Sequence, residues 1–319
     1  MAERVRFSDD IEPLVRFIEE TPRTEILDRT LAKLRGGVPV RAMLTASALA
    51  VTRSSDLPPG HHGGPLHPLA GLYAVSKLTE RLDGEQKFLP VMQHVALANK
   101  HIHDPVTGPY NLLEFDPLDA GGIEATKAAF LKAAGRGESN KADHLFQWLW
   151  RNVPPIDAFD LLLSVAIPKN VLDDHYFIFP AFTWRGLDCI GRAYLPLLMR
   201  PSVRYVARFP AQRIVPEIDA LIEEHQLLNR VLRQRTGDDE TSVIGRIGEA
   251  IGRCDAYTEV PVMLAKALAG GLSLEGAGEA LSIGAAGLFL RSLTGNPMDV
   301  HLHTSANLRR YLLRLDGLS

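Results

Sequence analysis

Apolar residues recur at the spacing of an amphipathic helix along most of this 319-residue chain. In residues 24–36, for example, Leu27, Leu31 and Leu34 fall on one helical face, and Gly36 is placed to end the helix. Stretches with the strict alternation of a half-buried strand are scarce. We therefore predict a mostly α fold, either a multi-helix bundle or an α-α repeat array, built as one large domain or as two closely packed helical halves.

The same periodicity predicts helices throughout the rest of the chain. They are expected at 38–52, 67–82, 85–100, 122–134, 140–152, 156–167, 170–198, 202–208, 211–235, 241–254, 258–270, 274–293 and 304–315. VRYVARF, residues 203–209, is the best candidate for a strand, and it suits a helix as well.

An irregular stretch interrupts the helical pattern in the first half of the chain. PVTGPYNLLEFDPLDAGG, which begins at residue 105, is rich in proline and glycine and predicts a linker or a loop over a site. We therefore expect an N-terminal helical part at 1–104 with a His-rich loop, an irregular loop at 105–121, and a C-terminal helical part at 122–319.

Two glycine-containing segments predict close helix packing. GRIGEAIG, residues 245–252, lies inside a helical pattern and not after a strand, so it does not indicate a dinucleotide site. Residues 268–290 are rich in glycine and alanine, but Glu275 and Glu279 interrupt the apolar run. A membrane span needs about 18 or more consecutive apolar residues, so no membrane partner is expected.

Charge and cysteine content narrow the function classes further. The 35 basic and 38 acidic residues give a net charge of −3, which makes nucleic acid an unexpected partner. The two cysteines, Cys189 and Cys254, form no CxxC motif or disulfide framework, and the charged start is unlike a signal peptide. We expect a cytoplasmic protein with a small-molecule substrate. The sequence leaves open whether the protein forms a homo-oligomer.

The histidines are unevenly distributed, and most fall into clusters. His61, His62 and His67 lie in LPPGHHGGPLHPLAG, His101 and His103 in HIHDP, and His301 and His303 in DVHLHTS, while His175 stands alone in LDDHYFIF. Neutral imidazole is the commonest protein metal ligand. We predict metal ligands from His62, His67, His101, His103, His175, His301 and His303.

The spacing of the two H-x-H pairs gives this hypothesis a geometric condition. In a helix, residues i and i+2 point about 200° apart, whereas in an extended segment they point the same way. Both pairs fall where a helix is expected to start or end, so locally extended backbone would let each pair hold one ion. Nitrogen and oxygen ligands admit iron, zinc, manganese or copper, with iron favoured for oxygenase chemistry. The alternative is that the histidines cap helices or lie in solvated loops.

Aromatic side chains surround His175 in the segment 173–191, DDHYFIFPAFTWRGLDCIG. His175, Phe179 and Phe182 share one helical face, and Pro180 is expected to kink the helix. An imidazole above an aromatic wall suits a pocket for a flat, apolar ligand. The predicted substrate-binding residues are Tyr176, Phe179, Phe182, Trp184 and Arg185; plain core packing is the alternative.

Two histidine-containing segments resemble a known family. HPLAGLYAVSKL, residues 67–78, resembles the HPLI-x-x-G-x-A helix entrance of the questin-oxidase-like proteins, and VHLHTSANLRRYLL, residues 300–313, is similar to their C-terminal H-x-x-T-x-x-x-A helix. Those proteins are largely helical, and their namesake carries out a Baeyer–Villiger-type ring-opening oxidation of a polyketide quinone. The resemblance implies His67, His301 and His303 as the carried-over positions.

These observations lead to one main functional hypothesis and two alternatives. We expect a His-rich helical oxidoreductase of the oxygenase type, metal-dependent, acting on an apolar, aromatic or polyketide-like molecule through His67, His175 and His303. The alternatives are a zinc-dependent hydrolase or lyase that uses the same histidines, and a helical binding scaffold without catalysis. Walker A, GxSxG and strand-following GxGxxG motifs are absent, so nicotinamide and flavin are not indicated.

Overall fold

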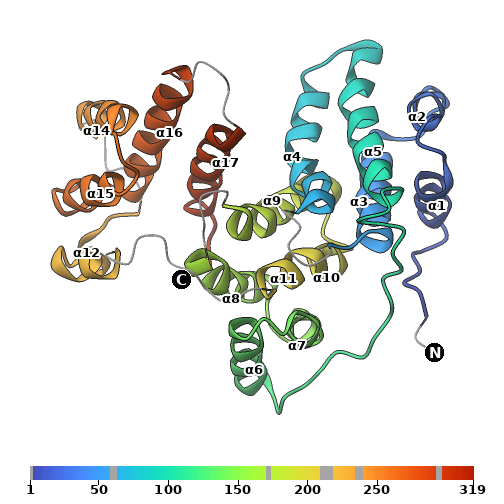
Figure 1. Cartoon of the computed structure of the whole chain (residues 1–319), viewed down its shortest axis with the longest axis horizontal. Coiled ribbons are helices and arrows are strands. Elements are labelled where there is room, and N and C mark those ends of the chain that lie inside the picture. The colour runs from blue at the N-terminus through green and yellow to red at the C-terminus, as the bar shows by residue number, and fades with distance from the viewer. Residues whose placement is uncertain (1–2, 58–62, 170–173, 209–217, 234–239, 292–296) are drawn as a thin grey trace. The chain divides into compact units, whose positions relative to one another are not determined.

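The protein folds into helices joined by short turns and irregular segments (Figure 1). The computed structural model describes residues 3–57, 63–169, 174–208, 218–233, 240–291 and 297–319. The helices are α1 (Glu12–Glu20), α2 (Ile26–Arg35), α3 (Val40–Ser54), η1 (Gly64–Leu66), α4 (His67–Glu80), η2 (Gly84–Lys87), α5 (Phe88–Ile102), α6 (Ile123–Gly135), α7 (Ser139–Asn152), α8 (Pro155–Ala166), η3 (Ile167–Lys169), α9 (His175–Ile190), α10 (Leu195–Leu198), α11 (Arg200–Val206), α12 (Ile218–Glu224), α13 (Leu227–Arg230), α14 (Thr241–Arg253), α15 (Glu259–Ala269), α16 (Leu274–Arg291) and α17 (Pro297–Leu312). Within these ranges, extended pairing is limited to an isolated bridge between Arg4 and Leu113. The prediction of a mostly α fold is confirmed.

The chain forms two compact units. Unit 1 comprises Met1–Lys169 and His175–Ala211, and unit 2 comprises Asn170–Asp174 and Gln212–Ser319. The irregular segment 105–121 contains no helix and joins α5 to α6 inside unit 1.

A helix without an exposed face lies at the centre of the N-terminal part of unit 1. Every residue of α3 from Met43 to Ser54 is buried, and α3 packs against α1, α4, α5, α9 and α10 (Figure 1). A helix enclosed on all sides is expected to be apolar all round. Because α3 nevertheless carries polar side chains, each of them needs a hydrogen-bond partner inside the protein.

Arg53 meets this need through a buried ionic network. Its side chain is 1% exposed, and its guanidinium lies 2.7 Å from Oε2 of Glu19 and 2.7 Å from Oε2 of Glu12, both on α1. The guanidinium carbon also lies 4.6 Å from the centre of the Phe7 ring. A buried charge without partners would be strongly destabilising, so the network ties α1 to α3 in one orientation.

His94 and Lys169 are further buried polar groups of unit 1. On α5, Nδ1 of His94 lies 3.0 Å from Oγ of Ser47, and Nε2 lies 2.7 Å from the carbonyl oxygen of Pro68, so three helices meet at one ring. Burial lowers the pKa of His94 to about 4.

Lys169 donates from Nζ to the carbonyl oxygens of Ala134 and Val206, at the C-terminal ends of α6 and α11, where a cation is favoured. Burial lowers the pKa of this ammonium to about 8.

Close contact between glycine-bearing helices characterises unit 2. A Cβ atom on Gly248 of α14 would lie 2.7 Å from Cβ of Ile283 on α16. A Cβ atom on Gly252 would lie 3.5 Å from the carbonyl oxygen of Gly284 and 3.6 Å from Cα of Gly287. The two backbones therefore approach closely, which confirms the packing predicted for residues 245–252 and 268–290.

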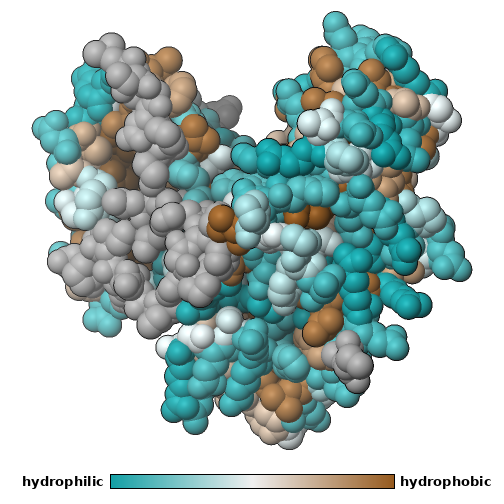
Figure 2. Space-filling view, turned by 45° about the vertical axis from the view of Figure 1, so that its right-hand side comes forward, coloured by the Kyte–Doolittle hydropathy of each residue, from teal (hydrophilic) through white to brown (hydrophobic). Residues whose placement is uncertain are grey.

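Hydrophilic residues predominate on the face shown in Figure 2, and the apolar residues visible there lie in scattered groups. In the part of the chain that the structure describes, no helix combines the length and the apolar character needed to cross a membrane.

Two predicted segments differ from the structure. The segment 203–209, which suited either a strand or a helix, is helical as far as Val206, in agreement with the helix expected at 202–208. The helix expected at 170–198 is divided, because α9 ends at Ile190 and is followed by Gly191 with a φ of +94°. In the expected helix 211–235, α12 and α13 are separated at Gln226, whose φ is +51°. Residues with positive φ do not continue a right-handed helix.

Candidate functional site

His67 begins α4, as the sequence predicts. Gly63 adopts a φ of +84°, and the turn η1 leads directly into α4, whose second residue is Pro68. Proline is well tolerated in the first turn of a helix. Nδ1 of His67 lies 3.0 Å from the carbonyl oxygen of Gly63. A carbonyl can only accept, so Nδ1 carries the proton in this geometry and Nε2 is the basic nitrogen of the neutral ring.

The structure brings His67 together with His175 and Phe179, which are distant from it in the sequence. The ring of His175, the first residue of α9, lies parallel to Phe179 with centroids 4.7 Å apart. The His67 ring stands edge-on to both, with centroids 5.5 Å from His175 and 5.2 Å from Phe179. The two imidazoles therefore meet against one aromatic surface.

Two glycines allow this approach. A Cβ atom on Gly186 of α9 would lie 2.8 Å from Cβ of Leu72 on α4, so any side chain there would push the helices apart. A Cβ atom on Gly63 would lie 2.5 Å from Cζ of Phe179. Gly63 is therefore required both for its positive φ and for the space that the aromatic ring occupies.

Tyrosines extend the aromatic surface. The ring of Tyr205 on α11 lies 5.3 Å from Phe179 and 5.1 Å from Tyr176, measured between centroids. We call His67, His175, Phe179, Tyr176 and Tyr205 the imidazole–aromatic cluster. His67 is its exposed member, whereas His175 and Phe179 are buried, so molecules can approach the cluster from the His67 side.

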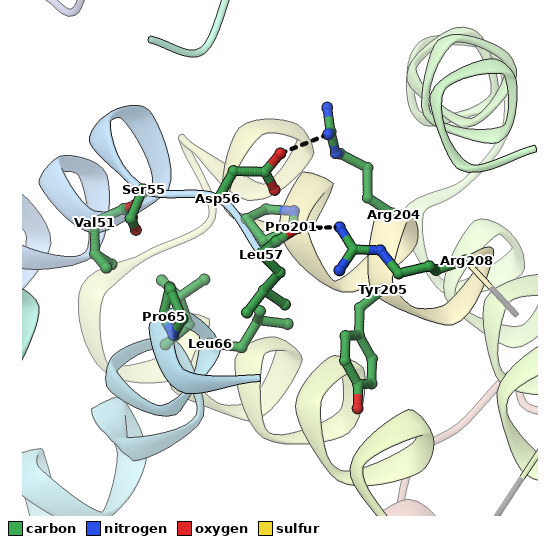
Figure 3. A pocket seen from close by; sticks show the side chains of 11 residues that line it. Val51, Ser55, Asp56, Leu57, Pro65, Leu66, Pro201, Arg204, Tyr205 and Arg208 are labelled. Atoms are coloured by element: carbon green, nitrogen blue, oxygen red, sulfur yellow. Dashed lines mark hydrogen bonds and ion pairs between the residues drawn. The ribbon is translucent and has the colours of Figure 1, made fainter. Parts of the chain in front are cut away.

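A small pocket adjoins the cluster at Tyr205 (Figure 3). Across it, Arg204 forms an ion pair of 2.8 Å with Asp56, and Arg208 donates to the carbonyl oxygen of Leu57. Its free volume of about 10 Å³ holds roughly one water molecule. The pocket is therefore too small for an aromatic ligand in this conformation.

Both H-x-H pairs lie in helical backbone, which corrects the extended conformation expected for them. His101 is in the last turn of α5 and His103 is its C-cap, with φ −95° and ψ 5°. His301 and His303 both lie within α17. The rings of each pair therefore diverge by about 200°, and neither pair can chelate one ion.

The predicted metal ligands are distributed over both units. His67, His101, His103 and His175 belong to unit 1, whereas His301 and His303 belong to unit 2. The ring of His303 stands edge-on to Phe289, with centroids 5.5 Å apart. His62 lies outside the described residues. That His303 joins His67 and His175 in one site stays a prediction.

A metal ion needs more ligands than the cluster supplies. Among the residues that the structure describes, no group of three or more His, Cys, Asp or Glu side chains could hold a metal ion. His67 and His175 provide two imidazoles, while biological zinc sites use three or four protein ligands. These residues alone do not fit a metal centre.

The predicted substrate-binding residues occupy different environments. Tyr176 and Phe179 belong to the imidazole–aromatic cluster, and Phe182 is half-buried. Trp184 is buried and stacks on Phe159 at 4.2 Å, a contact typical of core packing. The guanidinium of Arg185 lies 3.8 Å from the centre of the Tyr73 ring.

Tyr205 is the cluster residue that the sequence does not reveal. It lies in VRYVARF, which carries no motif, and it meets Tyr176 and Phe179 only through the packing of α11 on α9. Aromatic residues in an amphipathic helix are ordinary core components, so no local signal distinguishes this one.

Comparisons with known proteins add no family assignment. No protein-family model matches the chain, and no match was found among curated proteins or solved structures. The likeness to the questin-oxidase-like proteins thus stays a resemblance of two short segments. These segments differ in structure, because His67 begins α4 whereas His303 lies inside α17.

Proposed function

We propose that the protein is an enzyme that oxidises a flat, apolar, aromatic small molecule at the imidazole–aromatic cluster. The observation that carries this proposal is the contact between His67 and His175, which two distant segments place against the ring of Phe179. Imidazole exchanges protons near neutral pH, so two imidazoles beside an aromatic surface suit proton transfer to or from a bound aromatic molecule.

His67 is suited to act first in this chemistry. Its Nδ1 proton is held by the Gly63 carbonyl, so Nε2 is the ring nitrogen that would accept a proton from a phenol or from a carbon next to a carbonyl group. Loss of that proton gives an electron-rich anion that dioxygen can oxidise. Phe179 and the two tyrosines would contact the substrate ring.

The adjoining pocket sets a condition on substrate binding. The pocket holds about one water molecule. A substrate would therefore either contact the cluster from the exposed side of His67 or displace the side chains of Tyr205 and Arg208.

The metal-dependent form of the proposal, with iron favoured over zinc, manganese or copper, requires at least one ligand beyond His67 and His175. Metal analysis of protein purified without an affinity tag tests this form. Bound zinc together with hydrolytic activity would favour the hydrolase or lyase alternative, and the absence of both metal and turnover would favour the binding scaffold.

Oxygen uptake with 2-hydroxyanthraquinone, a flat molecule with a phenol and two ketones, tests the main proposal. We expect His67→Gln to lower the turnover by about 100-fold or more, the usual contribution of a general base. Its melting temperature should stay within a few degrees of the parent, because His67 is exposed. His225→Gln, in unit 2, is the matched control and should keep full activity. Full turnover in His67→Gln would overturn the proposal.

A further inference from the structure

Unit 1 contains a second, larger cleft that shares no lining residue with the imidazole–aromatic cluster. It lies where the N-terminal segment, residues 114–117, α7 and residues 193–200 meet. Its free volume of about 340 Å³ falls within the range of small-molecule sites, roughly 300–1,000 Å³.

The charges of this cleft are unbalanced. Arg200 is buried and forms an ion pair of 3.0 Å with the buried Asp143, so its charge is compensated. Arg6 and Arg151 are exposed on the lining, and neither side chain makes a hydrogen bond or ion pair with another residue that the structure describes. Glu114 is the acidic residue of the lining. Two uncompensated arginines against one glutamate leave a net charge of +1.

The aromatic walls of the cleft are held in place before any ligand binds. Phe115 stacks on His144, with ring centroids 3.8 Å apart, and the guanidinium carbon of Arg200 lies 4.2 Å from the centre of the Phe115 ring. These two contacts hold the Phe115 ring in place. The hydroxyl of Tyr194 is hydrogen-bonded to Oγ of Ser8 at 3.1 Å, which orients the second ring.

We propose that this cleft binds a small aromatic carboxylate. The ring system would lie against Leu197 and the side chains of Phe115 and Tyr194, and the carboxylate would face Arg6 and Arg151. A monoanion matches the net charge of +1, whereas a neutral ligand would leave this charge uncompensated. Planar guanidinium groups bind carboxylates through paired hydrogen bonds. The inference concerns different residues from the proposed oxidation and does not depend on it.

Calorimetric titration with 2-naphthoate tests this inference, with 2-naphthylmethanol as the neutral ligand of similar shape. We expect saturable binding of one naphthoate per chain and at least tenfold weaker binding of the alcohol. Arg151→Gln should weaken naphthoate binding at least tenfold. Ala193→Trp, at an exposed position of the lining, should fill the cleft and abolish binding. Melting temperatures establish that both variants are folded.

Two controls separate this site from other surfaces. Arg81→Gln removes an exposed arginine at the end of α4, and it should leave naphthoate affinity unchanged. His67→Gln should also bind naphthoate normally, even where it has lost oxygen uptake. The inference is overturned if naphthoate does not bind, if the alcohol binds equally well, or if Ala193→Trp binds like the parent.

Discussion

Units 1 and 2 hold their helices together in different ways. Unit 1 buries large and charged side chains, among them Phe130, Phe146 and Arg53, and each buried charge has partners at hydrogen-bond distance. Unit 2 brings α14 and α16 into contact through glycines, with a small core that includes Ile244 and Ala280. Buried ion pairs fix the orientation of helices because their hydrogen bonds need particular directions. Glycine contacts fix it because a larger side chain would not fit between the two backbones. Substitutions should therefore affect the two units through different physical mechanisms.

The largest expected effect is on the ionic network of unit 1. Arg53→Met leaves the carboxylate of Glu19 buried without its main partner, and we expect a loss of about 3–5 kcal/mol in the free energy of unfolding. All three tryptophans, at 148, 150 and 184, belong to unit 1, so fluorescence in a urea titration reports this unit.

The matched control is Arg35→Met, which removes an exposed ion pair with Glu85. Exposed ion pairs are screened by solvent and contribute little to stability, so this variant should lose much less than Arg53→Met. Equal losses in the two variants would contradict the role assigned to buried charge in unit 1.

A pH-dependent effect on unit 1 comes next. The pKa of His94 is about 4 in the folded protein, against 6.5 for an ordinary histidine. As the pH falls from 6.5 to 4, the unfolded chain takes up a proton that the folded protein does not, so stability decreases. The loss is about 3 kcal/mol over this window, from about 1.4 kcal/mol per pKa unit. Urea titrations of the parent and of His94→Gln at several pH values measure it, because the variant lacks this contribution. Parallel curves would show that His94 titrates normally.

The smallest expected effect concerns the glycine contacts of unit 2. Gly248→Ala places a methyl group 2.7 Å from Cβ of Ile283, and we expect a loss of about 1–3 kcal/mol from overpacking. Gly245→Ala, on the same helix, meets nothing within 4 Å and should gain up to about 1 kcal/mol from helix propensity. Far-ultraviolet circular dichroism in urea measures both. A gain of stability in both variants would mean that close contact does not hold α14 and α16 together.

Much of the helical architecture could be predicted from local patterns. The start of α4 at His67 and the spacing of the glycines along α14 are local features of the sequence, although the residues that these glycines contact lie on α16. The sequence pattern predicts that the last helix starts at residue 304, whereas α17 begins at Pro297. Proline has no backbone N–H group. Because the first turn of a helix does not use that group in an internal hydrogen bond, a helix can begin at proline. This shift converts the expected extended pair His301 and His303 into helical residues.

The candidate site was less predictable because its parts meet only in the folded chain. The shared helical face identified His175 and Phe179 together, since this relation is local. The approach of His67 depends on Gly186 fitting against Leu72, a contact between distant segments that spacing alone does not encode.

The full enclosure of α3 has a consequence for divergence. Each residue from Met43 to Ser54 has neighbours on every side, so a substitution there must be matched by changes in the surrounding helices. Exposed positions elsewhere can be substituted one at a time without matching changes in their neighbours. A remote relative of this protein should therefore keep the volume and pattern of this stretch after its surface has become unrecognisable.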